Sequence, residues 1–291
     1  MKKSWTILLL LKETEQYFKK AGIKTARLDS ELLLSDCLKK DRVNLYMDFE
    51  SPVSSAELSE FRELVRRRAK REPVSYILGY KEFWSIKLSV NRDVLIPRPE
   101  TEVLVEETVG ILNKSGCNNE HQRVLEMGTG SGAISLALAK EKDNILVFSV
   151  DISCKALKKA KANVNTYGFG RKVILACGDC LNLFRCEEHF DLIVSNPPYV
   201  RTAEIDRLEP EIKDYEPREA LDGGEDGLDF YWKWIPKLPG LLKKDGWAAL
   251  EMGEGQAQAV SQIFKSSESY KNIKIVKDYA KCDRVILAQK K

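Results

Sequence analysis

A proline-rich tetrapeptide follows a short apolar run in the second half of the chain. Residues 191–195 are typical of a buried strand, and Asn196, Pro197, Pro198 and Tyr199 come directly after them. The two prolines end the strand, stiffen the loop and remove two backbone donors. The Asn196 side chain and the Pro197 carbonyl can then accept two N–H bonds, and Tyr199 offers a flat face for stacking. The segment therefore has the groups needed to hold a planar nitrogen.

The chemistry that such a loop favours is methylation of an amide or exocyclic amine. These nitrogens are poor nucleophiles because their lone pair is delocalised. Acceptors fixed on both N–H bonds orient the nitrogen and raise its electron density as positive charge develops. No general base is required, and the only histidines, His121 and His189, lie outside the motif. A rigid proline turn without chemistry is the structural alternative.

A glycine-rich segment follows another strand-like run and precedes a helix-like one. Glycines at this place allow a tight turn and the close approach of a ligand. Asp151 ends the next predicted strand, 23 residues after Gly128, where a carboxylate can accept hydrogen bonds from both hydroxyls of a ribose. The pair of features predicts a nucleoside-containing ligand. The candidate binding residues in the segment are Glu126, Gly128, Thr129, Gly130, Ser131 and Gly132.

The identity of the nucleoside is not decided by this loop. Gly128, Gly130 and Ala133 also satisfy the relaxed dinucleotide fingerprint, so a dinucleotide and S-adenosylmethionine both remain open. Asp179 ends a third predicted strand and is placed to reach an adenine amino group, with Cys180 against the purine. For Asp179 the equally weighted alternative is a helix N-cap.

Strands and helices alternate from residue 123 onward. This alternation predicts a doubly wound α/β sheet. The link between the last two strands is too short for a parallel crossover, so we expect that pair to be antiparallel. The predicted strands cover residues 124–127, 145–150, 173–176, 192–195, 247–251, 273–276 and 285–288, and the clearest helices 133–140, 154–165 and 228–242.

The first 72 residues have helical periodicity and predict a small bundle. We expect Asp29 or Ser30 to cap its second helix and Ser54 or Ser55 to begin a later one. Residues 73–99 differ: strands are predicted at 76–78 and 83–90, with Gly79 as the turn between them, and two prolines follow. This stretch is interpreted as a connector between domains.

Composition places the chain among soluble globular proteins. It has 291 residues, 43% hydrophobic and 31% charged, and no apolar run approaches the ~20 residues of a membrane span. No secretory signal is recognised, so we expect a cytoplasmic location. The net charge is only +3, which does not indicate a nucleic-acid binder. The basic run at residues 66–71 is interpreted as a solvated helix face rather than a contact for RNA or an acidic partner.

The cysteines predict neither a disulfide framework nor a metal site. Seven cysteines is an odd number in a long chain, which favours a reducing compartment. Cys177 and Cys180 form a C-x-x-C, but no second pair has zinc-site spacing, and neither Cys154 nor Cys186 adds a paired partner. We interpret this spacing as coincidental and expect no metal.

The chain resembles the HemK/PrmC family of protein-(glutamine-N5) methyltransferases, which act on class I peptide chain release factors. The tetrapeptide Asn196–Tyr199 is shared with adenine-N6 and other amino-methyltransferases, so it indicates the reaction type rather than the substrate. More specific segments carry the resemblance to this family. They are residues 72–79 (EPVSYILG), 82–84 (EFW), 95–102 (LIPRPETE), 216–224 (EPREALDGG) and 226–228 (DGL).

The resemblance implies a fold and a domain order. The fold is a Rossmann-like class I S-adenosylmethionine-dependent methyltransferase, α/β with seven strands and an antiparallel last pair. This methyltransferase domain would cover residues 100–291. A helical-bundle domain at residues 1–72, contacting the release factor, and a β-hairpin linker at residues 73–99 would precede it.

It also implies roles for residues. The glycine segment, Asp151, Cys180 and Asn196 would line S-adenosyl-L-methionine, whose product is S-adenosyl-L-homocysteine. Asn196, Pro197, Pro198 and Tyr199 would hold the glutamine of the Gly-Gly-Gln motif of the release factor. Arg98, Pro99 and Thr101 would lie beside the pocket or serve as a structural linker. Some relatives carry an aromatic residue at the position of Cys180, and a cysteine packs more weakly on adenine.

Three other functions are compatible with parts of the sequence. An adenine-N6 methyltransferase would use the same loop, but residues 96–291 carry a net charge of −2 and no added recognition domain. A non-catalytic nucleoside-binding module would not need Asn196 and Tyr199. A nicotinamide-dependent oxidoreductase would leave the tetrapeptide unexplained. We expect a monomer without a nucleic-acid substrate or membrane partner.

Overall fold

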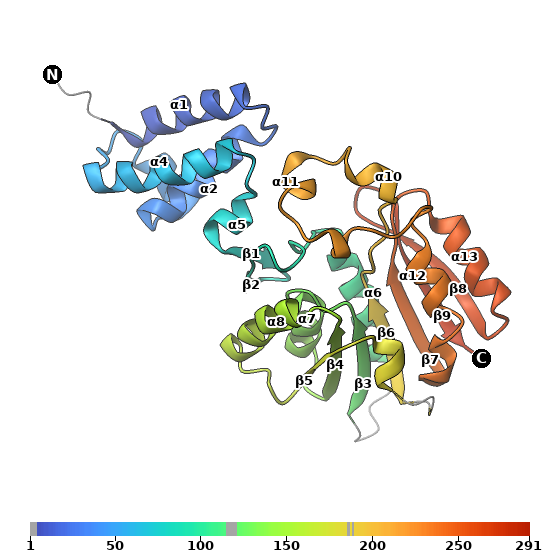
Figure 1. The fold of residues 1–291 in the computed structure, drawn as a ribbon. Coiled ribbons are helices and arrows are strands. Elements are labelled where there is room, and N and C mark those ends of the chain that lie inside the picture. The colour runs from blue at the N-terminus through green and yellow to red at the C-terminus, as the bar shows by residue number, and fades with distance from the viewer. Residues whose placement is uncertain (1–4, 115–120, 185–186, 188) are drawn as a thin grey trace. The chain divides into compact units, whose positions relative to one another are not determined.

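The computed structural model describes residues 5–114, 121–184, 187 and 189–291, and Figure 1 shows its elements along the chain. The chain divides into two compact units. The first contains Met1–Tyr80 together with Glu209–Tyr215, and the second contains Lys81–Leu208 together with Glu216–Lys291. The helices of the first unit are α1 (Ile7–Lys20), α2 (Ala26–Leu38), α3 (Arg42–Met47), α4 (Ser55–Ala69), α5 (Val74–Leu78) and α11 (Pro210–Lys213).

The first unit is the predicted helical bundle, and its helices bury one shared apolar core that includes Phe18, Leu33 and Phe61. The predicted start of α4 is confirmed. Ser54 caps it through a reciprocal pair of hydrogen bonds with Glu57, which satisfies donors at the helix N-terminus.

The predicted start of α2 is wrong, because the helix begins at Ala26, three residues before Asp29. Asp29 does not cap the helix. Its carboxylate is buried inside the bundle, where Arg68 Nε donates to Asp29 Oδ2 at 2.7 Å. A sequence pattern that identifies Asp as a capping residue cannot detect an ion-pair partner 39 residues away.

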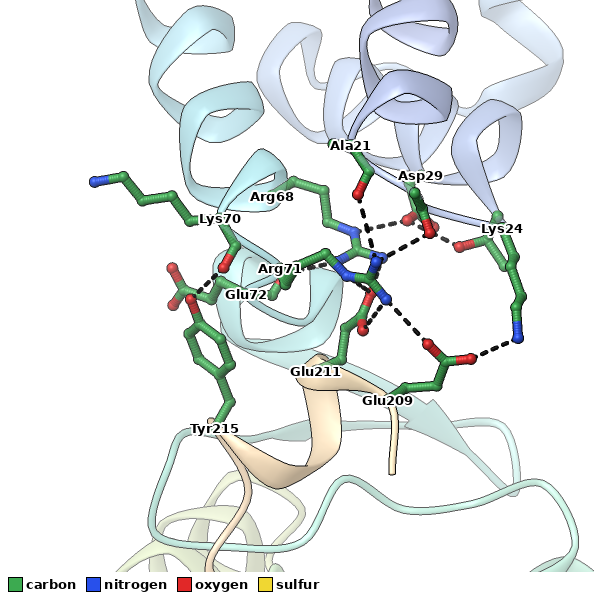
Figure 2. A network of polar contacts seen from close by, with 12 residues as sticks. Ala21, Lys24, Asp29, Arg68, Lys70, Arg71, Glu72, Glu209, Glu211 and Tyr215 are labelled. Carbon is green, nitrogen blue, oxygen red and sulfur yellow. Dashed lines mark hydrogen bonds and ion pairs between the residues drawn. The ribbon is translucent and has the colours of Figure 1, made fainter. Parts of the chain in front are cut away.

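The basic run on α4 completes a polar network within the first unit (Figure 2). Arg68 is only 4% exposed, and its Nη2 donates to Glu211 Oε1 at 2.7 Å. Arg71 Nη2 donates to Glu211 Oε2 at 2.6 Å and to Glu209 Oε2 at 3.1 Å. The interpretation of this run as a solvated face is therefore wrong for Arg68, although it holds for Arg66, which is exposed. Two of the acidic partners, Glu209 and Glu211, come from the second half of the chain, whereas Asp29 comes from α2.

The observed division differs from the predicted boundaries in two respects. The predicted connector is not a separate part, because residues 73–80 belong to the first unit and residues 81–99 to the second. Residues 1–72, 73–99 and 100–291 were expected to be contiguous parts. Residues 209–215 instead belong to the first unit, where Tyr215 Oη also donates to the Lys70 carbonyl at 2.7 Å. Local sequence patterns cannot show that residues 209–215 pack with helices formed by the first 80 residues of the chain.

The connector contains a hairpin, but not where the pattern placed it. Residues 76–78, predicted as strand, lie in helix α5, which Gly79 ends at φ +80°. The strands are β1 (Tyr80–Phe83) and β2 (Ile86–Ser89). Trp84 and Ser85 form the turn at φ of +51° and +53°, and Glu102 Oε1 accepts from the Trp84 N–H at 2.8 Å. Contacts with other elements thus stabilise a left-handed turn that contains no glycine.

The second unit is built on a seven-stranded sheet, as predicted. Its strand order is β5-β4-β3-β6-β7-β9-β8, and β9 is antiparallel to both of its neighbours while the other pairs are parallel. The prediction of an antiparallel last pair is confirmed. The strands are β3 (Gln122–Met127), β4 (Ile145–Asp151), β5 (Val173–Cys177), β6 (Phe190–Ser195), β7 (Leu242–Glu251), β8 (Tyr270–Lys277) and β9 (Asp283–Lys290).

Helices pack on both faces of this sheet, and Figure 1 shows them around the strands. Alternate residues of β3 and β6 belong to two separate apolar cores: Val124 and Val194 pack with α6 and α7, whereas Leu125 and Ile193 pack with α12 and α13. The helices of this unit are α6 (Thr101–Lys114), α7 (Ala133–Glu141), α8 (Cys154–Thr166), α9 (Cys180–Leu183), α10 (Thr202–Ile205), α12 (Asp229–Trp234) and α13 (Ala257–Ser266).

The helix predicted over residues 228–242 is too long. Helix α12 ends at Trp234, and a 3₁₀ turn at Leu238–Gly240 leads into β7. Pro236 and Pro239 explain the break, because proline removes a helical hydrogen bond and clashes with the preceding turn. Among the described residues, none of the helices is both long and apolar enough to span a membrane.

Candidate active site

The two loops that the sequence identified meet at one edge of the sheet. Strands β3 and β6 are parallel neighbours, with Met127 opposite Ser195, and the Ser195 hydroxyl donates to the Met127 carbonyl at 2.6 Å. The glycine segment leaves the carboxyl end of β3, and Asn196 leaves that of β6. Strand β4 follows β3 on its other side, so the strand order reverses between β3 and β6. Ligands of open α/β sheets bind at such a switch point.

The glycine segment is held against β4 by backbone contacts. The N–H groups of Gly128 and Thr129 donate to the Val150 carbonyl at 2.9 and 3.1 Å. The Gly130 N–H donates to Asp151 Oδ2 at 2.8 Å, and Asp151 Oδ1 accepts from the Ser153 N–H at 2.8 Å. Each Asp151 oxygen accepts one hydrogen bond and has a further lone pair for a ligand hydroxyl. The structure thus brings Asp151 to the glycine turn, as predicted.

The last glycine of the turn is favoured by its left-handed backbone and by the limited space around it. Gly132 has φ +84°, and a Cβ there would lie 2.7 Å from Leu136 Cδ1 and 3.5 Å from the Ala160 Cβ. Thr129 and Ser131 are buried, and the Ser131 carbonyl accepts from Asn163 Nδ2 at 2.8 Å. The side chains of Thr129 and Ser131 thus pack within the turn. The sequence proposed these residues as ligand contacts, and that role stays a prediction.

Glu126 lies beneath the glycine turn rather than at its open side. It is 1% exposed, its Oε2 accepts from the Ser135 hydroxyl, and its Oε1 has no hydrogen-bond partner among the described residues. Burial raises the pKa of this carboxyl to about 8, although its hydrogen bonds with Ser135 and Ser149 oppose the shift. A protonated Glu126 would carry no charge under the turn at neutral pH.

Asp179 caps helix α9, which is the structural alternative that the sequence left open. Its Oδ1 accepts from the Leu181 N–H at 3.2 Å, and Lys233 donates to Oδ2 at 3.0 Å. The Lys233 ammonium holds the pKa of Asp179 below its usual value. Cys180 is buried beside it, and burial raises the pKa of the thiol to about 12.

The C-x-x-C does not form a pair in the structure. Cys177, at the end of β5, is instead disulfide-bonded to Cys154, the first residue of α8, with a Cα–Cα distance of 5.8 Å. The interpretation of the spacing as coincidental agrees with this. The sequence predicted no disulfide framework, and it gave no sign of this single bridge. Asp151 lies opposite Cys177 in the sheet, so the bridge joins two turns at the predicted nucleoside site. Cys117 and Cys186 lie outside the described residues.

The Asn196 amide is oriented by a threonine from another element. Asn196 Nδ2 donates to Thr101 Oγ1 at 3.1 Å, at the start of α6. Within the described part of the chain, Asn196 Oδ1 and the Pro197 carbonyl accept no hydrogen bond, as the sequence predicted for this loop. Two acceptors are thus left for a ligand at the edge of the sheet.

Tyr199 is fixed at both ends. Its hydroxyl donates to Glu251 Oε1 at 3.3 Å, and its carbonyl accepts from Gln256 Nε2 at 3.0 Å. Burial, together with the nearby Glu251 charge, raises the pKa of the Tyr199 hydroxyl well above its usual value. The ring is therefore neutral and held in place.

Two of the family-specific segments contact each other and the tetrapeptide. Arg98 Nη2 donates to Glu216 Oε1 at 2.6 Å, and the Ile96 N–H donates to Glu216 Oε2 at 3.1 Å. Burial raises the pKa of Glu216, and the Arg98 charge opposes this. At Gly223, a Cβ would lie 2.8 Å from the Tyr199 Cα and 2.9 Å from the Pro198 carbonyl oxygen. These contacts explain why the two segments are needed beside the loop.

Sequence reasoning missed Glu251 and Gln256. Glu251 is fully buried at the carboxyl end of β7, and the Gln256 side chain holds both Tyr199 and the Gly253 N–H. A charged residue at the end of a predicted central strand was a usable signal, because such ends line the ligand crevice. For Gln256 we find no local sequence signal.

Comparison with known proteins identifies the family. Residues 10–79 match the family model described as PrmC N-terminal domain, and residues 104–210 match the one described as Methyltransferase small domain. The release factor glutamine methyltransferase of Geobacter sulfurreducens is 44% identical over 89% of this chain and 88% of its own length. That of Caulobacter vibrioides is 38% identical over 99% and 96%. The chain belongs to the release factor glutamine methyltransferase family.

A solved methyltransferase structure from Pyrococcus furiosus has the same fold. It is 18% identical, covers 77% of this chain and 98% of its own, and has a TM-score of 0.52. The fold is thus the Rossmann-like methyltransferase fold, with seven strands and an antiparallel last pair, that the resemblance implied. Among the described residues no group of three or more His, Cys, Asp or Glu side chains could hold a metal ion.

The residues at this edge fit the adenosyl cofactor of such methyltransferases. The space above Gly130 is open, because a Cβ there would meet no atom within 4 Å. Asp151 retains acceptor capacity beside that space, and Asn196 lies on the neighbouring strand end. A hydroxyl-bearing sugar joined through a sulfonium to an amino-acid chain needs these features: room at the backbone, a carboxylate and no bulky side chain.

Proposed function

We propose that this protein transfers a methyl group from S-adenosyl-L-methionine to the side-chain amide nitrogen of the glutamine in the Gly-Gly-Gln motif of class I release factors. Bound cofactor would supply an electrophilic methyl group on a sulfonium. The observation that carries the proposal is the pair of unoccupied acceptors, Asn196 Oδ1 and the Pro197 carbonyl, at the switch point beside the glycine turn. The relatives of similar length support the choice of substrate.

In this proposal the chain works by positioning. Asn196 Oδ1 and the Pro197 carbonyl accept the two amide N–H bonds and so aim the nitrogen lone pair at the methyl carbon. As the N–C bond forms, the C–S bond breaks and its electron pair returns to sulfur. Positive charge on nitrogen is stabilised by the two acceptors, and its proton then leaves to solvent. Tyr199 and Pro198 form the walls that hold the amide plane.

The remaining site residues have supporting roles. We assign Asp151 to the ribose hydroxyls, Cys180 to the face of the adenine, and Glu126, Thr129, Ser131 and Gly132 to the shape of the turn. Asp179 is assigned an indirect role, because it caps α9 and so sets the position of Cys180 at the start of that helix. The first unit is proposed as a second contact for the release factor. We place the enzyme in the cytoplasm, where translation occurs, and expect a monomer.

The test is methyl transfer from labelled S-adenosylmethionine to a purified release factor. The control is a release factor whose Gly-Gly-Gln glutamine is changed to alanine. DNA and tRNA are added as competing acceptors. We expect label on the unchanged factor alone, and its loss with the Asn196→Ala enzyme. Label on nucleic acid would contradict the proposal and favour an adenine-N6 activity. Cofactor binding without any transfer would favour a binding module.

A further inference from the structure

A buried carboxylate connects the two halves of the tetrapeptide. Glu251 contacts Tyr199 directly and lies within the electrostatic reach of Thr101, which in turn accepts from Asn196. Neither the predicted site nor the reaction chemistry above assigns Glu251 a role. Its side chain is fully buried, and its Oε2 has no hydrogen-bond partner among the described residues.

The direction of each hydrogen bond follows from counting donors. A threonine hydroxyl has one hydrogen to donate. Asn196 Nδ2 already occupies a lone pair of Thr101 Oγ1, and no other acceptor for the Thr101 hydrogen is found in the described part of the chain. That hydrogen is therefore directed to the Glu251 carboxylate, with which the Thr101 side chain forms a hydrogen bond. An ionised carboxylate accepts only, so it enforces this direction.

We propose that Glu251 is a positioning residue, whose ionised carboxylate sets the direction of the Thr101 hydroxyl and thereby turns Asn196 Oδ1, not Nδ2, toward the substrate amide. The same carboxylate holds the Tyr199 ring through its hydroxyl. This role rests on the proposed function, because it concerns the presentation of the glutamine. It predicts that a change at Glu251 affects the methyl-transfer step while leaving cofactor binding intact.

Protonation of Glu251 would weaken this arrangement. A carboxylic acid can donate to Thr101 Oγ1 and so compete with Asn196 Nδ2 for the same oxygen. Burial raises the pKa of Glu251 to about 7, and the Thr101 hydroxyl and the Arg284 charge oppose the shift. The charged and titratable groups that face it are Arg284 of β9, Tyr199, Tyr231 of α12 and Glu100. We therefore expect activity to fall as the pH drops below about 7.

The experiment compares Glu251→Gln, Thr101→Val and Thr101→Ser with the wild type. Each is assayed for kcat and KM toward the release factor, and for the Kd of S-adenosylhomocysteine by calorimetry. Glu268→Gln, an exposed glutamate outside the site, is the matched control. The Kd measurement also tests whether each variant is folded, because the predicted cofactor-binding residues lie in the second unit together with Thr101 and Glu251.

We expect kcat of Glu251→Gln to fall by about one to two orders of magnitude, the loss typical of a misplaced reacting group, with Kd within about twofold. Thr101→Val should lose a similar factor, and Thr101→Ser should recover most of it because the hydroxyl is retained. The acidic limb of the kcat profile, near pH 7 in the wild type, should be absent from Glu251→Gln.

Two results would overturn the role of Glu251. One is an unchanged kcat in Glu251→Gln, and the other is an equal loss of kcat and of cofactor affinity, which a merely structural residue would give. A wild-type enzyme that binds S-adenosylhomocysteine but methylates no release factor would contradict the proposed function itself, and this role with it.

Discussion

Replacement of Arg68 by alanine should loosen the segment 209–215 from the first unit. Arg68 is 4% exposed and donates to two carboxylates, Asp29 and Glu211, each at 2.7 Å. Removing one partner of a buried ion pair generally costs about 3–5 kcal/mol, because a charge is left without compensation.

The surrounding contacts place the loss at the lower end of that range. Glu211 keeps Arg71 at 2.6 Å, and Asp29 keeps the Thr25 hydroxyl at 2.9 Å. We therefore expect Arg68→Ala to cost about 3 kcal/mol, which is roughly a hundredfold in a local opening equilibrium. Burial of both Arg68 and Asp29 means that solvent screens little of this effect.

Amide hydrogen exchange followed by mass spectrometry measures the effect where it should occur. We expect exchange to accelerate in peptides covering 209–215 and α4, and to stay unchanged in strands β3 and β6. Arg66→Ala is the matched control, since Arg66 lies on the same helix and, among the described residues, its ion pair is with exposed Glu63. If Arg68→Ala and Arg66→Ala behave alike, the network does not hold the segment and the reasoning is refuted.

Three further changes test other parts of the structure. Cys154→Ser should lower the free energy of unfolding of the second unit by about 3 kcal/mol, because the bridge to Cys177 closes a loop with a sequence separation of 23. The measurement is urea unfolding under oxidising conditions. Wild-type protein with a reducing agent should match the variant, and unequal values would contradict this. Gly223→Ala should abolish methyl transfer while S-adenosylhomocysteine still binds, because its Cβ would lie 2.8 Å from the Tyr199 Cα; retained activity would show that the loop can shift. Burial raises the pKa of Glu126 to about 8, so the stability this group contributes is complete below its ordinary pKa and is lost as the pH rises through about 8. Thermal unfolding of Glu126→Gln should therefore lack this decline in Tm, which in the wild type lies between the ordinary pKa of glutamate and about 8. Parallel curves for the two proteins would disprove the assignment.

Much of the fold could be predicted because its signals are local or periodic. Most strands of the large sheet contain apolar runs, although β8 alternates apolar residues with lysines. The short link between β8 and β9 predicted their antiparallel pairing. The cap of α4 was predicted because Ser54 and Glu57 are three residues apart. The errors arose where distant contacts decide the conformation, as at residues 76–78, where Pro73 and Gly79 enclose a short helix that packs on the bundle.

The candidate site follows the same division. Asn196, Asp151 and the glycine turn were found because loop chemistry at strand ends is readable from sequence. Glu251 and Gln256 were not, since their roles depend on which strands are neighbours and which hydrogen bonds remain unmade. The bridge between Cys154 and Cys177 was also missed, because it follows from the pairing of β4 with β5 and not from cysteine spacing.

The first unit is built from two separate stretches of sequence, and this limits how its gene can recombine with that of a homologue. A single recombination event near residue 80 would join the helices of one homologue to a segment 209–215 from another. Arg68 and Arg71 would then face a segment that evolved with other partners, and its carboxylates could be misplaced or missing. Exchange of the helical part as one cassette is therefore penalised, whereas joint inheritance is favoured. Sequence changes in α4 should be accompanied by changes at Glu209 and Glu211, more than a hundred residues away.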